Sequence, residues 1–283
     1  MDNFVVFILT HGRADNVITA ATLKRCGYTG KTVIVIDNED ETAEEYKKKF
    51  GAGNVYQFDK KAVSMTFDTI DLSEDRRTIV YARNVCFDIA RELGYKYFLE
   101  LDDDYKTFEF RFPNEDGTKL MCKDCKDLDA MFGYMIDFLN DTGADTVAFA
   151  QGGDFIGGIQ SGMYQKKVLR KAMNTFFCNV EKPFKFLGRI NEDVNTYTYR
   201  GSVGWLGLSI TDCAIQQKQT QKNKGGMSDV YIDNGTYLKS IYSVIIMPSA
   251  VKIGAMGGNH IRFHHSIEWD NCVPKILNEA LKK

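Results

Sequence analysis

The sequence has no large excess of charge of either sign and no long hydrophobic run. Its 36 lysines and arginines nearly balance its 38 aspartates and glutamates, for a net charge of −2. That balance argues against a strongly basic nucleic-acid-binding protein, although it leaves room for a local basic face. No apolar run approaches the roughly 18 residues that indicate a membrane span. The apolar start, 1–9, lacks a basic segment and a cleavage-like site, so we expect no signal peptide.

The sequence also lacks a disulfide framework. Its seven cysteines are an odd number and are scattered, which favours reduced thiols in a cytosol. Cys122 and Cys125 have the spacing of a zinc-ligand pair, but no second pair lies nearby, and we interpret them as loop thiols. There is no internal repeat and no low-complexity tract. We therefore expect a cytoplasmic protein with no membrane partner.

Strands alternate with helices through the first hundred residues. Apolar runs predict strands at Phe4–Leu9, Thr32–Ile36, Asn54–Phe58 and Tyr97–Leu101, and helical spacing predicts helices at Asp15–Cys26, Glu44–Phe50 and Thr78–Leu93. This rhythm predicts an α/β fold with a parallel sheet. In such sheets, ligands bind beyond the carboxyl ends of the strands.

The second half of the sequence is less regular. We expect helices at Leu128–Asn140 and Lys166–Asn174, and strands at Thr146–Ala150 and Tyr237–Met247, the last of which could pair with Ala250–Ile253. No stretch has the composition of a linker between independent domains.

Three aspartates, Asp102, Asp103 and Asp104, directly follow the predicted strand at 97–101. Carboxylates two residues apart at a strand end can turn toward one ion, so Asp102 and Asp104 are candidate ligands of Mg²⁺ or Mn²⁺. Such an ion shares its coordination sphere with phosphates and would neutralise a departing diphosphate. A solvated acidic turn is the alternative, and the buried strand and long helix before the aspartates favour the metal site.

Other polar residues follow the first two strands or precede the aspartates. Thr10 and Arg13 end the first strand, and Asp37 ends the second. Asp37 could accept a hydrogen bond from a base or a ribose, or could cap a helix. Arg83, early in the helix before the aspartates, could reach a phosphate or a ribose, or could be an ordinary surface arginine.

Two further groups are candidates for chemistry. One carboxylate of Glu192 and Asp193 could take a proton from an attacking hydroxyl, although a helix cap explains the pair equally well. Three of the four histidines, at 260, 264 and 265, fall within six residues. On an extended segment His260 and His264 share a face and His265 takes the other. One neutral imidazole could complete the metal sphere begun by the aspartates.

A basic stretch near aromatic residues occurs in the second half. Its members are Lys218, Lys222 and Lys224 in a segment rich in Gln, Lys and Gly, with Tyr197, Tyr199 and Trp205 upstream. Together they could form a surface that follows a phosphate backbone and stacks bases. An ordinary solvated helix face is the alternative, although the segment has the composition of a mobile substrate loop.

The order of these features resembles GT-A glycosyltransferases. More narrowly, the sequence is similar to the TET/JBP-associated glycosyltransferases of phages. The similar segments are Ile8-Leu-Thr-His-Gly-Arg13, Arg25-Cys-Gly-Tyr-Thr-Gly30, Phe98-Leu-Glu-Leu-Asp-Asp-Asp-Tyr105, Lys224-Gly-Gly-Met227, Gly235-Thr-Tyr237 and His264-His265. Members of that family are thought to add sugars to 5-hydroxymethylpyrimidines in phage DNA.

The resemblance implies a GT-A, Rossmann-like nucleotide-sugar-binding fold with a mostly parallel central sheet. It implies one domain over residues 1–283, with a nucleotide-sugar-binding half at 1–104 and an acceptor-binding half at 105–283. The implied donor is a UDP-sugar, the implied metal Mn²⁺ or Mg²⁺, and the implied acceptor 5-hydroxymethylcytosine in DNA. A phage-encoded enzyme of this kind would act in the cytoplasm of the host cell.

The resemblance also implies a role for each candidate residue. Thr10, Arg13 and Asp37 would hold the nucleoside, Arg83 would reach the diphosphate, Asp102 and Asp103 would lie against the donor, and Asp102 and Asp104 would bind the metal, with His264 or His265 completing its sphere. Glu192 and Asp193 match the place of the base in an inverting enzyme. A retaining enzyme needs no such base, so the stereochemistry stays open.

Other functions stay open at this point. The acceptor could be a protein, a lipid or a glycan rather than DNA. A non-enzymatic nucleotide-sugar-binding module would not need the intact aspartates. A nucleotidyltransferase usually has a Gly-rich basic loop after its first strand, which the residues from Thr10 to Arg13 match poorly.

Overall fold

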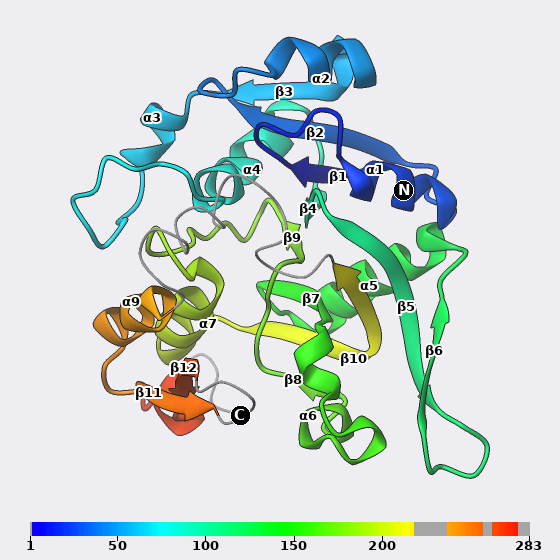
Figure 1. The fold of residues 1–283 in the computed structure, drawn as a ribbon, viewed down its shortest axis with the longest axis vertical. Coiled ribbons are helices and arrows are strands. Elements are labelled where there is room, and N and C mark those ends of the chain that lie inside the picture. Colours follow the sequence, from blue (N-terminus) through cyan, green and yellow to red (C-terminus); the bar gives the residue numbers. More distant parts are fainter. Residues whose placement is uncertain (1, 218–236, 257–261, 277–283) are drawn as a thin grey trace.

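The centre of the protein is one ten-stranded β-sheet, seen in a computed structural model that describes residues 2–217, 237–256 and 262–276 (Figure 1). In sheet order its strands are β3 (Val55–Phe58), β2 (Lys31–Asp37), β1 (Phe4–Leu9), β4 (Tyr97–Asp102), β9 (Phe176–Asn179), β7 (Thr146–Ala150), β10 (Gly207–Gln217), β5 (Tyr105–Pro113) and β6 (Leu120–Asp124), and β8 (Val168–Leu169) pairs with β10. The pairing of β4 with β9 puts strands from both predicted halves of the chain in the same sheet.

Most strands of this sheet run in one direction. The pairs β3–β2, β2–β1, β1–β4 and β7–β10 are parallel. Strand β9 runs antiparallel to both β4 and β7, so β7 and β10 point the same way as β1. Seven strands, namely β1 to β4, β6, β7 and β10, therefore share one direction, and β5, β8 and β9 oppose it. This confirms the predicted α/β fold with a mostly parallel sheet.

Helices cover both faces of the sheet because the strands alternate their apolar side chains. Phe4, Val6 and Ile8 of β1 belong to one apolar core, with residues of α1 (Ile18–Arg25) and α5 (Leu128–Thr142). Val5 and Phe7 point to the other face and pack in a second core with α4 (Val80–Glu92). Successive side chains of a strand point to opposite faces, so a continuous apolar run such as Phe4–Leu9 is expected where both faces are buried.

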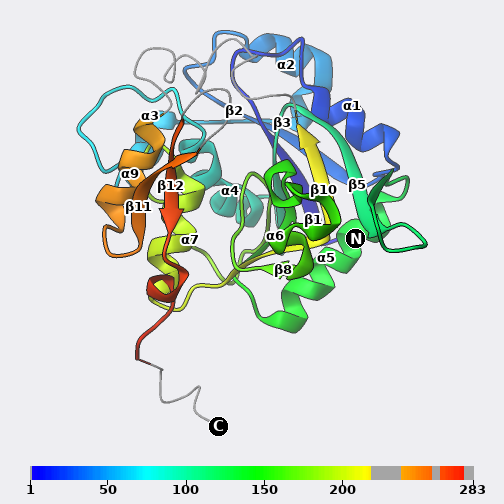
Figure 2. The same ribbon diagram turned by 60° about the horizontal axis from the view of Figure 1, so that its bottom comes forward.

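The remaining helices lie at the edges of the sheet or to one side of it. They are α2 (Ala43–Phe50), α3 (Lys60–Ser64), α6 (Gly162–Gln165), α7 (Glu192–Ser202) and α9 (Leu238–Ile246), and β11 (Val251–Met256) and β12 (Arg262–Ile267) form a separate two-stranded sheet. Helices α7 and α9 lie together with β11 and β12 on one side of the molecule, away from α1 and α5 (Figures 1 and 2). None of the helices in the described part of the chain is long and apolar enough to cross a membrane.

Two predicted elements of the second half are wrong. The segment Lys166–Asn174 is not a helix, because Lys167 and Asn174 both have positive φ, near 60°, and β8 between them pairs with β10. The segment Tyr237–Met247 is not a strand but contains helix α9, and β11 pairs with β12 instead. Its β-branched residues favour a strand. In the helix, Ser240 and Ser243 are buried, and the Ser243 hydroxyl donates to Asn195 Oδ1 of α7 at 2.7 Å.

All seven cysteines are free in the structure. Cys122 lies on strand β6 and is exposed, whereas Cys125 follows the strand and is buried. The prediction of loop thiols is therefore wrong for Cys122, which lies within a strand, whereas Cys125 comes directly after it. Within the described ranges, no group of three or more His, Cys, Asp or Glu side chains is gathered closely enough to hold a metal ion by itself.

Candidate functional site

The carboxyl ends of β1, β2 and β4 bring the predicted polar segments together. The Thr10 hydroxyl donates to Asp103 Oδ2 at 2.7 Å, and Arg13 Nη1 donates to Asp103 Oδ1 at 3.1 Å. The Tyr46 hydroxyl, from α2, lies 2.9 Å from Thr10 Oγ1 and accepts the backbone N–H of Arg13 at 2.8 Å. Asp103 is buried, so its carboxylate fixes the loop after β1 against the aspartate turn after β4.

A second network joins the loop after β1 to the loop after β2. Asp37 is buried, and its Oδ2 lies 2.8 Å from His11 Nδ1 and 3.1 Å from Lys60 Nζ. The backbone N–H of Glu39 donates to the other oxygen, Oδ1, at 3.0 Å. Burial works against ionisation of Asp37, but the hydrogen bond from His11 and the charge of Lys60 outweigh it and lower the pKa of this carboxyl. Asp37 is thus a carboxylate behind His11, and the His11 side chain is 42% exposed.

Helix α1 contacts the aspartate turn, residues 102–104, through Thr19. The Thr19 hydroxyl donates to the backbone oxygen of Asp102 at 2.6 Å and accepts the backbone N–H of Tyr105 at 2.9 Å. Burial, and next the charges of Asp102 and Asp103, raise the pKa of Asp104 to about 7. Carboxylates that repel one another in this way are stabilised by a divalent cation, and oxygen ligands are those that Mg²⁺ and Mn²⁺ prefer. The turn therefore suits an ion whose remaining ligands come from phosphates.

Arg83 lies inside the protein between the aspartate turn and α7. Its side chain is 2% exposed, with Nη2 3.2 Å from Asp102 Oδ1, Nε 3.0 Å from Glu192 Oε1 and Nη1 3.7 Å from Glu100 Oε2. Its guanidinium also stacks over the ring of Phe176, 4.7 Å from the centroid. Burial disfavours its charge, but Asp102, Glu192 and Glu100 outweigh burial and raise its pKa. Arg83 joins the metal candidate Asp102 to the base candidate Glu192, and its predicted contact with a diphosphate stays a prediction.

Glu192 and Asp193 form the first turn of α7 and are both buried. Burial, opposed by Arg83, raises the pKa of Glu192 to about 7, and burial likewise raises the pKa of Asp193. Glu100 is fully buried, its carboxylate oxygens have no hydrogen-bond partner, and burial raises its pKa to about 8. The single guanidinium of Arg83 lies near several buried carboxyls and cannot neutralise all of them. Those that it does not neutralise are stabilised by a bound proton or by a nearby cation.

His264 and His265 lie next to each other on β12, with ring centroids 4.1 Å apart. Burial, followed by the charges of His264, Lys239 and Lys171, lowers the pKa of His265 to about 3. Burial and Lys239 also lower the pKa of His264, so both rings are neutral, as a metal ligand must be. The nearby lysines oppose a cation, and the role of either histidine as a metal ligand stays a prediction. His260 lies outside the described residues.

The predicted aromatic surface is corrected by the structure. Tyr197 is buried and stacks on Trp269, with ring centroids 5.6 Å apart. Trp205 is buried and packs edge-on against Phe184. Their apolar rings are used in the core, so neither is an exposed stacking face, whereas Tyr199 is exposed. The three lysines of the predicted basic stretch, Lys218, Lys222 and Lys224, lie outside the described residues.

Four site residues were not singled out from the sequence: His11, Tyr46, Lys60 and Glu100. His11 lies in the loop from Thr10 to Arg13, which the sequence already indicates as part of the site. Glu100 could have been found from the sequence, because a carboxyl in the middle of a buried strand is rare and indicates a specific role. Tyr46 has the spacing of an ordinary core aromatic on α2. Lys60 gave no signal, since only the fold brings it to Asp37.

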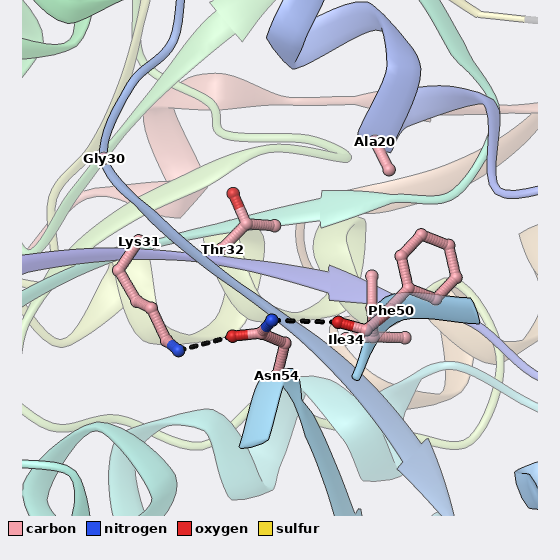
Figure 3. A pocket seen from close by; sticks show the side chains of 7 residues that line it. All are labelled: Ala20, Gly30, Lys31, Thr32, Ile34, Phe50 and Asn54. Atoms are coloured by element: carbon pink, nitrogen blue, oxygen red, sulfur yellow. Dashed lines mark hydrogen bonds between the residues drawn. The ribbon is translucent and has the colours of Figure 1, made fainter. Parts of the chain in front are cut away.

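A pocket elsewhere on β2 is separate from this site. It lies at the start of the strand, beside Lys31, Thr32 and Ile34, whereas Asp37 is at the other end (Figure 3). Lys31 Nζ donates to Asn54 Oδ1 at 2.6 Å on its rim. The pocket shares no lining residue with the candidate site.

Residues 4–226 match the sequence family described as TET-Associated Glycosyltransferase. The chain belongs to this family. The family predicted from the sequence is confirmed, and the protein is a glycosyltransferase. No curated protein matches the chain.

Several solved structures are similar to the chain at low identity. Glucosyl-3-phosphoglycerate synthase from Mycobacterium tuberculosis, in complex with Mg²⁺ and UDP, has 8% identity and a TM-score of 0.46, over 94% of this chain and 86% of that one. Mannosyl-3-phosphoglycerate synthase from Rubrobacter xylanophilus has 11% identity and a TM-score of 0.43, over 94% and 87%. S. aureus TarS has 11% identity and a TM-score of 0.44, over 87% of this chain and 42% of that one. With scores this low, the family assignment rests on the sequence match.

Proposed function

We propose that this glycosyltransferase takes a sugar from a UDP-sugar, with Mn²⁺ or Mg²⁺, and transfers it to 5-hydroxymethylcytosine or a related hydroxymethylpyrimidine in DNA. The observation that carries the proposal is the joined network at the carboxyl ends of β1, β2 and β4 in a member of this family. We also propose a GT-A site in one domain over residues 1–283, with the donor bound by the 1–104 half and the acceptor by the 105–283 half.

Asp102 and Asp104 are the proposed metal ligands. Asp102 is 24% exposed and gives Oδ1 to Arg83, which leaves Oδ2 for an ion. A divalent ion held by Asp102 and Asp104 would stabilise the negative charge of the departing diphosphate. The guanidinium of Arg83 holds Asp102 in place from the buried side. Thr10 and Arg13 are the proposed nucleoside contacts, and both donate hydrogen bonds to Asp103, which lies beside the proposed metal ligands.

Glu192 and Asp193 are the proposed source of the base. The acceptor's hydroxymethyl oxygen forms a bond to the anomeric carbon of the sugar, the bond from that carbon to the diphosphate breaks, and the hydroxyl proton passes to one of the two carboxylates. A raised carboxyl pKa suits this task, because the base then holds the proton well near neutral pH. This reaction inverts the anomeric centre, and a retaining reaction would not need the pair.

The DNA acceptor is supported by the family to which the chain belongs. The net charge of −2 gives no general attraction to DNA, so affinity would depend on a local patch. A target base in a duplex must also leave the stack before its hydroxymethyl group can reach the donor. The alternative acceptor is a protein, a lipid or a glycan, for which little dependence on salt is expected.

The test is an acceptor panel with several nucleotide sugars. The enzyme, Mn²⁺ and each donor are incubated with duplex or single-stranded DNA that contains 5-hydroxymethylcytosine, with matched cytosine DNA as a control, and the digested nucleosides are measured by mass spectrometry. With UDP-sugars, we expect the mass of one hexose to be added to the hydroxymethylated nucleoside only. The yield of this product should fall steeply as the salt concentration rises. Asp104→Asn should give no product while keeping its fold. Transfer to a protein or glycan but to no modified DNA would overturn the DNA acceptor and leave the glycosyltransferase.

A further inference from the structure

In the network that joins the loop after β1 to the loop after β2, the His11 side chain is exposed and can contact a ligand. Asp37, which the sequence suggested as the nucleoside contact, is buried and accepts three hydrogen bonds, from His11, Lys60 and the Glu39 backbone. The His11 ring lies over it and is 42% exposed. A base arriving at the end of β2 therefore meets the imidazole before it meets the carboxylate.

The contact with Asp37 decides which nitrogen of His11 carries the proton. Asp37 is ionised, because Lys60 Nζ lies 3.1 Å from the same oxygen that receives His11 Nδ1. A carboxylate accepts hydrogen bonds only, so Nδ1 of His11 must carry a hydrogen. In a neutral imidazole the other nitrogen, Nε2, then has a free lone pair and is an acceptor. No residue in the described part of the chain takes a hydrogen bond from or gives one to Nε2.

The backbone around His11 is fixed on both sides. The Gly12 N–H donates to Asp40 Oδ2 at 2.7 Å, and the Arg13 N–H donates to the Tyr46 hydroxyl at 2.8 Å. Gly12 has a φ of +65°, which lets the chain turn so that its N–H reaches Asp40. Thr10 is tied to Asp103, beside the proposed metal ligands. His11 is thus held at a set position relative to the aspartates, as a residue that recognises one end of a donor must be.

We propose that His11 recognises the base of the donor nucleotide, with Nε2 accepting a hydrogen bond from a ring N–H. This proposal rests on the proposed function, in which the donor is a nucleotide sugar. Uracil has such a group at N3, whereas cytosine has a lone pair at N3 and would place two acceptors face to face. A pyrimidine with a ring N–H therefore binds well. One without it binds more weakly, because Nε2 of His11 and the facing ring atom are left without a hydrogen bond. Asp37 and Lys60 act as positioning residues behind the histidine.

The test compares nucleotides that differ at this one atom. Binding of UDP, N3-methyl-UDP and CDP is measured by calorimetry in the presence of Mn²⁺, with the wild type, His11→Phe and the surface control Lys48→Ala. Phenylalanine keeps a planar ring but has no nitrogen, and Asp37 keeps Lys60 as its partner, so the fold should survive. Thermal unfolding of each variant checks this.

We expect the wild type and Lys48→Ala to bind UDP roughly ten-fold more tightly than N3-methyl-UDP or CDP, the size of effect that one hydrogen bond gives. His11→Phe should bind all three with similar, weaker affinity. If the wild type binds UDP and N3-methyl-UDP equally, or if His11→Phe still prefers UDP, the role of His11 is refuted while the UDP donor stands. If ADP binds and UDP does not, the proposed donor fails, and the role of His11 fails with it.

Discussion

Removing the guanidinium of Arg83 should destabilise the protein strongly. Arg83 is the cation in contact with Asp102, Glu192 and Glu100, at 3.2, 3.0 and 3.7 Å, and its side chain is 2% exposed. Breaking a buried ion pair by removing one partner costs about 3–5 kcal/mol, because the remaining charge is buried without compensation. Arg83→Met keeps much of the side-chain volume, so the loss would come from charge and hydrogen bonding rather than from a cavity. We expect a loss of about 3–5 kcal/mol.

Thermal and urea unfolding followed by circular dichroism measure this loss. For a chain of this size, about 3–5 kcal/mol corresponds to a fall in Tm of roughly 10 °C. The matched control is Arg91→Met, on the same helix, whose guanidinium lies 2.9 Å from Asp88 but is 43% exposed. A surface pair of this kind contributes at most about 1 kcal/mol, so the control should change stability little.

A double-mutant cycle separates the ion pair from other effects. Arg83→Met combined with Glu192→Gln should lose less stability than the two single changes added together, with a coupling of about 1 kcal/mol or more, because the second change removes a carboxylate left without its partner. If Arg83→Met unfolds at the wild-type temperature, or if the two changes add without coupling, then the buried cluster does not depend on Arg83 and the reasoning is refuted.

Three further predictions concern other parts of the molecule. Gly27→Ala should cost roughly 2–4 kcal/mol in urea unfolding, because a Cβ there would clash with the Lys126 backbone oxygen. Gly94→Ala, with similar φ but open space around the Cβ, should cost about 1 kcal/mol, and equal losses would contradict this. The pKa of Asp37 is lowered by folding, so the stabilisation that this carboxylate gives is present above about pH 4 and is lost as the pH falls through the folded-state pKa. Asp37→Asn should therefore make the free energy of unfolding depend less on pH on the acid side, and an unchanged pH dependence would contradict this. If Glu192 takes the proton, its pKa of about 7 makes turnover rise with pH through about 7, since the base must be deprotonated, and Glu192→Gln should lose this rise; a flat profile in the wild type would count against the assignment.

The first half of the fold follows closely from the sequence because its elements repeat a regular pattern. Each strand from β1 to β4 is an apolar run between turn signals, and the strands agree with the expected ranges within one or two residues. Because parallel strands end at one edge, Thr10, Asp37 and Asp102 were predictable neighbours. Their partners were not, since Tyr46 and Lys60 reach the site only through the packing of α2 and α3.

The second half was less predictable because its elements depend on tertiary contacts. Strands β5 and β10 alternate exposed and buried residues imperfectly, and β9 is buried along most of its length. The register of β10 is irregular against β5 and against β7. Helix α9 is rich in β-branched residues and is helical because it packs on α7 and on the β11–β12 hairpin. Tyr197 and Trp205 are residue types that can form an exposed stacking surface or part of the core. Only their burial in the structure shows that they belong to the core.

The central claim is that the ends of β1, β2 and β4 bind a nucleotide diphosphate together with a divalent ion. Calorimetric titration of UDP with and without Mn²⁺, in the wild type and in Asp104→Asn, tests it most directly. The account predicts tight binding by the wild type only when Mn²⁺ is present, and loss of this metal effect in Asp104→Asn with no loss of fold. Equal binding of UDP by both proteins, with or without Mn²⁺, would contradict it.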